Sequence, residues 1–332
     1  MKYVKFLCLV VGVALFALLL HETDTQKVWH QVTQIGWGGI ALVVGIYFIG
    51  CLTDVYTWQL TFNSIPLNLR WFFRLFLVRM VGEAFNHVTP FASMGGETVK
   101  AVMLKNYYDV GYREAGASLV LAKTLDSLML IVFLSSGFCL LLTSNKLPTT
   151  FKLVAGLGLA ALSFGIVMFF LVQRLRLMSR LSRWLAGSRF GKRLSRLERS
   201  LNETDEMIVG FYAKRQRRFG TALGVAFINW PLGVLEIYCI MGLLGHLPSF
   251  TDAWIIDTVV QLVSAGTFFI PATIGTQEGA FILVCSSITG NPALGLAVSL
   301  VRRFREILWI LAGLAISWLF SFKPTLPDRT IS

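Results

Sequence analysis

Long apolar runs separated by short polar stretches make up most of this chain. A helix needs about 20 consecutive apolar residues to cross the hydrocarbon core of a bilayer. Six runs are close to this length and predict spanning helices, over residues 4–20, 36–58, 115–142, 153–172, 219–245 and 294–321. Two more runs, 72–105 and 254–289, are interrupted by polar residues near their middle. The pattern predicts an all-α polytopic membrane protein with six transmembrane helices and two broken segments.

The composition leaves almost no room for a soluble domain. The 332 residues are 55% hydrophobic and 14% charged, and the mean hydropathy is +0.67. A soluble protein of this size has about 25% charged residues. We therefore expect a single integral membrane domain over 1–322, followed by a short tail over 323–332. Within it, two half-repeats over about 36–142 and 219–321 are joined by a basic segment, 174–218.

The two broken segments contain similar polar sequences. The first reads TPFASMGGETVK over 89–100, and the second reads IPATIGTQEGAF over 270–281. In both, a Pro ends the apolar run, glycine follows, and a Glu lies seven residues after the Pro. These residues are Pro90, Gly96 and Glu97 in the first copy, and Pro271, Gly275 and Glu278 in the second. Paired, interrupted hydrophobic segments in corresponding halves are the best sequence sign of a transporter-type site at mid-membrane.

A basic–acidic pair follows each copy within an apolar stretch. Lys123 precedes Asp126, and Arg303 precedes Glu306. Equivalent prolines and glutamates of the two copies lie 181 residues apart, and equivalent members of these pairs lie 180 apart. Residues three apart on a helix are neighbours, so each pair is expected to form an ion pair. Such a pair either supports the helix packing or belongs to the site itself.

The distribution of Lys and Arg predicts the orientation in the membrane. Residues 174–218 contain 13 of the 30 basic residues against four acids, so this segment is predicted to be cytoplasmic. Both termini then also lie in the cytoplasm. Apolar residues recur within the segment at helical spacing, which favours an amphipathic helix on anionic lipid, with a simple orientation anchor as the alternative. Nucleic-acid binding is not expected, because no basic fold with interleaved aromatic residues accompanies the charge.

The same charge count predicts that the broken segments are re-entrant hairpins. The first would enter from the cytoplasmic side and turn near Pro90, and the second would enter from the outer side and turn near Pro271. Two similar hairpins of opposite orientation form an inverted repeat. Arg302 and Arg305 fit this count poorly, since they lie near the outer end of the last helix, and they add spare positive charge beside Arg303.

Each hairpin is expected to carry a polar pocket. A half-helix that starts near Gly96 or Gly275 presents free N–H groups and a positive dipole end, which together suit an anion. Glu97 and Glu278 lie in the first turns, where they either cap the helix, bind a cationic or hydroxylated headgroup, or carry a proton. Nearby polar residues that would complete the pockets are Asn86, His87 and Lys100 in the first copy, and Thr276 and Gln277 in the second. No metal site, cofactor motif or catalytic signature is expected.

At these residues the chain resembles a known family. The runs GEAFNHVTPFASMGGETVKAVML (82–104), IPATIGTQEGAFILV (270–284) and SLVRRFREIL (299–308) are similar to the signatures of the flippase-like, lysylphosphatidylglycerol synthase transmembrane-region family. The forms "PF…GGE" and "RFRE" are most similar to its hopanoid-biosynthesis-associated branch. The resemblance implies an inner-membrane protein that moves a lipid between leaflets. It implicates Asn86, Pro90, Gly96, Glu97, Pro271, Gly275, Glu278, Arg303 and Glu306.

The leading hypothesis is therefore a lipid translocase rather than an enzyme. Its headgroup path would run through a polar cavity where the hairpins meet, and movement would be downhill or coupled to an ion gradient, with Glu97 or Glu278 as proton carriers. Full-length lysyl-lipid synthases add a soluble catalytic domain after this region, and the chain stops at Ser332, so synthase activity is not expected. The alternatives are a membrane-embedded lipid transferase, and a scaffold that docks lipid-biosynthesis proteins on the basic segment.

Overall fold

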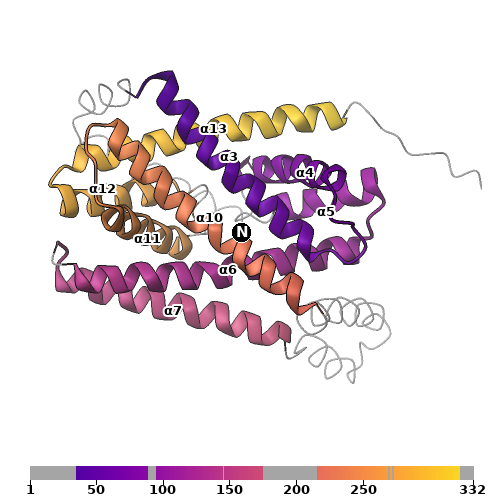
Figure 1. Ribbon diagram of the computed structural model, residues 1–332, viewed down its shortest axis with the longest axis horizontal. Coiled ribbons are helices and arrows are strands. Elements are labelled where there is room, and N and C mark those ends of the chain that lie inside the picture. Colours follow the sequence, from indigo (N-terminus) through magenta and orange to yellow (C-terminus); the bar gives the residue numbers. More distant parts are fainter. Residues whose placement is uncertain are drawn as a thin grey trace, which may run out of the picture. The chain divides into compact units, whose positions relative to one another are not determined.

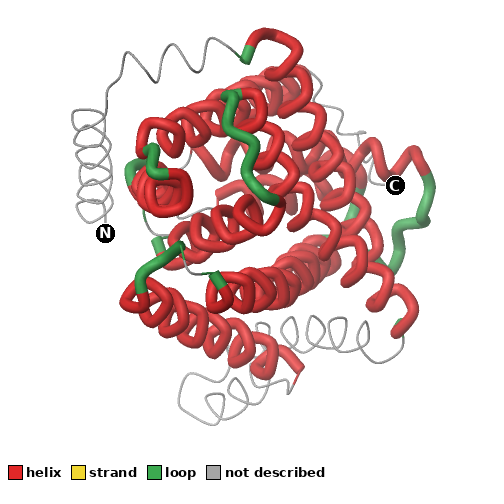
Figure 2. The backbone as a smooth tube through the Cα atoms, turned by 60° about the vertical axis from the view of Figure 1, so that its left-hand side comes forward, coloured by secondary structure: helices red, strands yellow, loops and turns green. Residues whose placement is uncertain are grey.

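The computed structural model describes residues 35–88, 95–144, 146–174, 215–267, 270 and 273–321. Every regular element in these ranges is a helix, and Figure 2 shows helices and loops but no strand among them. The helices, labelled in Figure 1, are α3 (Gly36–Thr61), α4 (Leu69–Val88), α5 (Gly95–Tyr108), α6 (Tyr112–Thr143), α7 (Thr149–Arg174), α10 (Gln216–Leu243), α11 (Phe250–Gly266), α12 (Thr276–Thr289) and α13 (Pro292–Ser321). The predicted all-α class is confirmed for the described residues.

Four of these helices are long and apolar enough to cross a membrane. They are α3, α6, α7 and α10, and they coincide with the runs predicted over 36–58, 115–142, 153–172 and 219–245. The run predicted over 294–321 forms one continuous helix, α13, which is not among the four and carries several charges in its middle. The run over 4–20 and residues 175–214 of the basic segment lie outside the described residues.

Each broken segment consists of two helices that pack against each other. α4 ends at Val88 and α5 begins at Gly95, while α11 ends at Gly266 and α12 begins at Thr276. Pro90 and Pro271 lie between them, outside the described residues. α5 and α12 have 14 residues each, which corresponds to about 21 Å of helix. That length is too short to cross a hydrocarbon core of about 30 Å.

The order of helices occurs twice along the chain. A long helix, two packed shorter helices and another long helix form α3–α6, and α10–α13 repeat this order. The starts of equivalent helices are Gly36 and Gln216, Leu69 and Phe250, Gly95 and Thr276, and Tyr112 and Pro292, in each case 180 or 181 residues apart. This is the same spacing as that of the repeated prolines and glutamates.

The chain divides into two compact units. Unit 1 comprises Met1–Asp54, Asp126–Ile166 and Val225–Leu308, and unit 2 comprises Val55–Leu125, Val167–Gly224 and Trp309–Ser332. The α11–α12 hairpin therefore belongs to unit 1, and the α4–α5 hairpin belongs to unit 2.

Unit 1 has a core of aromatic rings and close helix contacts. The ring of Phe133 on α6 stacks on Trp230 of α10 with 5.3 Å between centroids, and lies 5.5 Å from Trp254 of α11. Glycines allow the backbones to approach where helices cross. A Cβ at Gly295 of α13 would lie 2.5 Å from the carbonyl oxygen of Phe281 on α12. The start of α13 is thus packed directly against the backbone of α12.

Unit 2 combines a small apolar cluster with polar contacts. The cluster consists of Leu60, Ala117, Leu121, Leu125 and Ala222. The indole N–H of Trp58 donates to Ser118 Oγ at 3.2 Å and joins α3 to α6. The Glu114 carboxylate accepts the backbone N–H groups of Asn63 and Ser64 at 3.0 and 2.8 Å, and so holds the loop after α3.

The close α12–α13 contact predicts that Gly295→Ala destabilises the protein. The added methyl group would meet main-chain atoms that cannot rotate away, and overpacking of this kind costs about 1–3 kcal/mol. The matched control is Gly165→Ala on α7, where nothing lies within 4 Å of the new Cβ. Thermal unfolding in detergent micelles should show a lower midpoint for the first variant only. Equal midpoints would mean that the helices do not approach so closely.

Candidate functional site

The α4–α5 hairpin is held by a close backbone crossing and a side-chain cap. A Cβ at Gly96 would collide with the carbonyl oxygen of Gly82, and a Cβ at Gly82 would overlap the side chain of Lys100. The absence of both Cβ atoms lets Asn86 Oδ1 accept the Gly96 N–H at 2.8 Å. One of the N–H groups that a helix start leaves unsatisfied is thereby paired. Asn86 thus acts as a cap for α5 from the neighbouring helix.

Lys100 is the buried cation of this hairpin. Its residue is 6% exposed, and its ammonium lies 2.8 Å from Glu97 Oε1 and 3.3 Å from Glu83 Oε1. The ammonium also lies 6.0 Å from the ring centroid of Trp58. One lysine on α5 therefore compensates a carboxylate on its own helix and another on α4. The Glu97 side chain is 40% exposed, so it remains open to a polar group from outside.

The α11–α12 hairpin starts its second helix differently. Gly275 precedes α12 with a φ of +81°, a conformation that residues with a Cβ rarely adopt. The Glu278 carboxylate, through Oε2, accepts the Gly275 N–H at 2.7 Å. Glu278 is therefore the cap of its own helix, which was one of the alternatives open for it. Thr273 Oγ1 donates to Gln277 Oε1 at 3.1 Å beside this cap.

Arg303 of α13 holds the capping carboxylate in place. Its Nε and Nη2 both donate to Glu278 Oε1, at 3.2 and 2.7 Å. Its Nη1 donates to Glu306 Oε2 at 2.9 Å, so the pair expected within one helical turn is present. One guanidinium thus ties the start of α12 to α13. The Glu278 side chain is 3% exposed, in contrast to Glu97.

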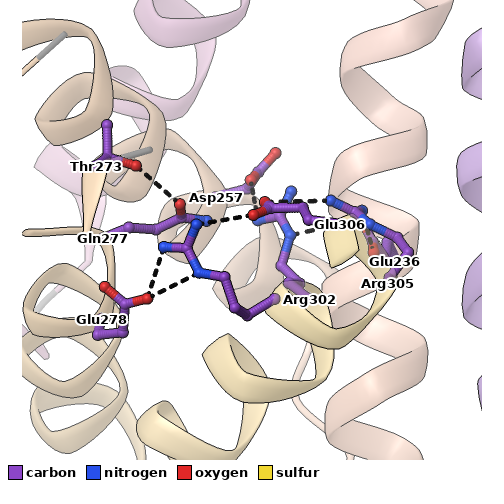
Figure 3. A network of polar contacts seen from close by, with 9 residues as sticks. Glu236, Asp257, Thr273, Gln277, Glu278, Arg302, Arg305 and Glu306 are labelled. Carbon is purple, nitrogen blue, oxygen red and sulfur yellow. Dashed lines mark hydrogen bonds and ion pairs between the residues drawn. The ribbon is translucent and has the colours of Figure 1, made fainter. Parts of the chain in front are cut away.

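The two flanking arginines extend this cluster into the core of unit 1. Arg302 Nη1 donates to Asp257 Oδ1 at 3.2 Å, and its Nε lies 3.5 Å from Glu236 Oε2. Arg305 contacts Glu236 Oε1 through Nη1, and its Nη2 lies 3.6 Å from Glu306 Oε1 (Figure 3). The expectation that Arg302 and Arg305 carry spare positive charge is therefore wrong. Their partners come from α10 and α11, which are far away in sequence.

A polar cavity of about 130 Å³ adjoins this cluster within unit 1. Its polar lining consists of Tyr47, Asn229, Glu236, Asp257, Gln261 and the two arginines 302 and 305. The guanidinium of Arg305 lies 3.9 Å from the Tyr47 ring centroid, which is a cation–π contact. A cavity of this size that is lined by several polar groups has room for several water molecules.

A separate ion pair lies at the start of α11, which is not one of the four candidate membrane spans. Lys146 Nζ donates to both carboxylate oxygens of Asp252 at 2.8 Å, and Ser249 Oγ donates to Asp252 Oδ2 at 2.7 Å. Burial alone would raise the pKa of Asp252, but these hydrogen bonds outweigh it and hold the pKa below its usual value. Asp252 therefore stays charged at neutral pH. The stability it contributes is lost only as the pH falls through this lowered pKa.

The predicted site residues thus fall into three groups. Asn86, Gly96, Glu97 and Lys100 come together in unit 2, and Gly275, Glu278, Arg303 and Glu306 come together in unit 1. Lys123 and Asp126 lie one turn apart on α6, Lys123 exposed and Asp126 half-buried, and their pairing stays a prediction.

Asp257 is the site residue that the sequence analysis missed. It is a single acid in the apolar run AWIIDTVVQLV, and it is fully buried in the structure. An ionisable residue inside a membrane segment is by itself a reason to expect a functional or paired group. That signal was present, but the partner, Arg302, is 45 residues away and could not be identified by spacing.

Comparison with known proteins identifies the family. A model of the lysylphosphatidylglycerol synthase TM region matches residues 6–314. The chain belongs to this family. A UPF0104 membrane protein of Pyrococcus horikoshii is 24% identical over 320 residues, which cover 92% of this chain and 93% of that protein. A UPF0104 membrane protein of Methanothermobacter thermautotrophicus is 21% identical over 341 residues, which cover 99% and 98%. No solved structure matches the chain significantly.

Family membership shows that this is a membrane protein and confirms the resemblance at the level of the lysylphosphatidylglycerol synthase TM region. The closer similarity to the hopanoid-associated branch stays a prediction.

The Arg303–Glu278 contact predicts a specific pattern of stability. Arg303→Gln leaves Glu278 without its guanidinium, while Glu306 keeps Arg305, and removing one partner of a buried ion pair costs about 3–5 kcal/mol. Adding Glu278→Gln removes the stranded charge while keeping an oxygen that can accept the Gly275 N–H. The double variant should therefore unfold at a higher denaturant concentration than Arg303→Gln alone. If the losses simply add, the two side chains do not interact.

Proposed function

We propose that this protein is a lipid translocase, which moves a lipid with a polar headgroup between the leaflets of the cytoplasmic membrane. Moving a charged or hydroxylated headgroup through hydrocarbon is costly unless its polar groups find partners on the way. The protein would supply these partners while the acyl chains stay in the bilayer. Membership of a family named for the membrane region of a lipid-modifying enzyme supports this substrate class.

The proposed topology has six spanning helices and two re-entrant hairpins of opposite orientation, with both termini in the cytoplasm. The repeated helix bounds and the 14-residue length of α5 and α12 support it. The ion pairs of unit 1 also bear on Arg302 and Arg305, the two residues that fit the charge count poorly. Because carboxylates compensate Arg302 and Arg305 inside the protein, these residues need not follow the distribution of Lys and Arg in loops.

One observation carries the proposal most directly. In both halves, a helix of 14 residues has in its first turn a carboxylate that is paired with a cation: Glu97 with the buried Lys100, and Glu278 with the partly buried Arg303. A headgroup that contains a phosphate and an amine or hydroxyl can bind both members of such a pair in place of their contact with each other. Its phosphate binds the cation, and its amine or hydroxyl binds the carboxylate. A soluble solute would not require the largely apolar surroundings of these groups.

The two glutamates would have different tasks. Glu97 is 40% exposed and is paired among the described residues with the flexible Lys100, so it can exchange this partner for a headgroup. Glu278 is 3% exposed and uses both carboxylate oxygens within the protein, so it fixes the start of α12. We further propose that the basic 174–218 segment binds anionic lipid at the membrane surface. Lipid-biosynthesis proteins are the candidate partners, and a hopanoid-related lipid is a candidate substrate.

Leaflet exchange of fluorescent lipids in proteoliposomes tests this function. Glu97→Gln should slow exchange by about tenfold or more, the effect of losing one charge-assisted hydrogen bond of about 1.5–3 kcal/mol, without lowering thermal stability. The matched control is Asp109→Asn, an 82% exposed acid paired with Lys105 at the end of α5, which should exchange lipid at the wild-type rate.

Exchange at the wild-type rate in a well-folded Glu97→Gln, Glu278→Gln double variant would contradict the assigned site. Formation of a new lipid product by the purified protein would instead favour the transferase.

A further inference from the structure

The buried charge cluster of unit 1 contains more carboxylates than guanidinium groups. Four acids, Glu236, Asp257, Glu278 and Glu306, contact three arginines, 302, 303 and 305. When all seven of these side chains are ionised, their formal charges sum to −1. A net charge is expensive in this environment, so the cluster needs one more positive charge.

The contacts of the four acids show where that charge is missing. Glu278 uses Oε1 for Arg303 and Oε2 for the Gly275 N–H. Glu306 has Arg303 at Oε2 and Arg305 at Oε1, and Glu236 has Arg305 at Oε1 and Arg302 at Oε2. Each of these three acids thus has both oxygens occupied by a donor or an ion-pair partner.

Asp257 is the exception. Arg302 contacts its Oδ1 at 3.2 Å, but Oδ2 is buried and has no hydrogen bond of good geometry among the described residues. The side-chain amide of Gln261, one turn further along α11, is close enough to interact with this carboxylate. Oδ2 faces Gly233 of α10, since a Cβ built there would lie 2.9 Å from it. Both residues line the polar cavity, and Asp257 has no exposed surface. An unpaired, fully buried carboxylate oxygen at a polar cavity is a place for a proton.

We infer that Asp257 binds a coupling proton, and that translocation is driven by a proton gradient through this cavity. The inference rests on the proposed translocase function and identifies the co-transported ion. A hydronium ion from the aqueous phase transfers its proton to Oδ2: one O–H bond of the hydronium breaks and leaves water, one O–H bond forms on the carboxyl group, and the seven side chains change from −1 to neutral. A metal cation is disfavoured, because two guanidinium groups, of Arg302 and Arg305, line the same cavity and would repel it.

The charged groups around Asp257 allow its protonation to affect the α11–α12 hairpin. Arg302 and Arg305 of α13, Glu236 of α10 and Tyr47 of α3 are the titratable groups around it, with the amides of Asn229 and Gln261. A neutral Asp257 attracts Arg302 less strongly, so Arg302 moves closer to Glu236. Glu236 then binds Arg305 less strongly, and Arg305 moves closer to Glu306. Because Arg303 is shared between Glu306 and Glu278, this shift changes how firmly the start of α12 is held.

The structure thereby assigns the proton to a different residue from the two first expected. Glu278 binds Arg303 and caps its helix, and Glu97 is paired with Lys100 in an exposed position. Neither has a free, buried oxygen.

Infrared spectra of the purified full chain test the proton site without any transport assay. In a detergent that has no ester groups, the wild type at neutral pH should show the C=O band of a protonated carboxyl group. The band should be lost in Asp257→Asn and retained in Asp252→Asn, the same substitution five residues earlier on α11, at an acid outside the cluster. Asp257→Glu, which keeps a carboxyl group beside the cavity, should restore it. Absence of the band from the wild type overturns the inference even if no variant folds.

Proteoliposomes with a pH gradient test the coupling. For one proton per lipid, a gradient of one pH unit should drive the labelled lipid to a leaflet ratio of up to about tenfold. This ratio should fall to the value without a gradient in Asp257→Asn and stay unchanged in Asp252→Asn. Exchange that does not depend on the pH gradient, or that depends on a sodium gradient instead, overturns the proposed proton coupling while leaving the translocase function in place. If the wild type exchanges no lipid at all, the translocase function fails, and the infrared band alone decides whether Asp257 holds a proton.

Discussion

In the proposed topology, α5 and α12 begin inside the bilayer, where no water can satisfy the backbone N–H groups that a helix start leaves unpaired, and the structure depends on how the chain meets this constraint. Both hairpins meet it with a side-chain oxygen, from Asn86 in one case and from Glu278 in the other. The carboxylates near each helix start then require a cation, and the cation fixes the helix against its neighbour. In this way one requirement of the backbone explains why charged residues occur in otherwise apolar segments.

The two halves use this solution with different rigidity. In unit 2 the cation, Lys100, lies on the half-helix itself and reaches Glu83 on α4 through a flexible chain. In unit 1 the cation is Arg303 on the following helix, and its planar guanidinium donates twice to Glu278. A guanidinium fixes geometry better than an ammonium does. The asymmetry suits the proposed mechanism, in which one hairpin exchanges its ion pair for a substrate while the other responds to a proton.

Much of this architecture follows from local sequence patterns. The apolar runs located α3, α6, α7 and α10, and the spacing of glycine and glutamate located the starts of α5 and α12. The pair Arg303–Glu306 was predictable because both residues lie on one turn of a helix.

The remaining contacts join residues far apart in the chain, and no local pattern specifies them. Arg302 looked like surplus charge because its partners, Glu236 and Asp257, lie on α10 and α11 and meet it only through tertiary packing. The cap on Gly96 was missed for a related reason, since Asn86 reaches it from the preceding helix across a contact between two glycines. Periodicity reports which face of a helix is buried, but not which helix covers that face.

The account requires that the two halves are inverted copies, and the sidedness of equivalent positions tests this most directly. Asn106 on α5 and Ser287 on α12 are exposed, lie 181 residues apart, and occupy the same place near the end of each half-helix. Each would be replaced by cysteine in a chain whose five natural cysteines have been removed, and labelled with a membrane-impermeant maleimide in vesicles of known orientation. The account predicts labelling of position 106 from the cytoplasmic side and of position 287 from the outer side. Labelling of both from the same side would contradict it.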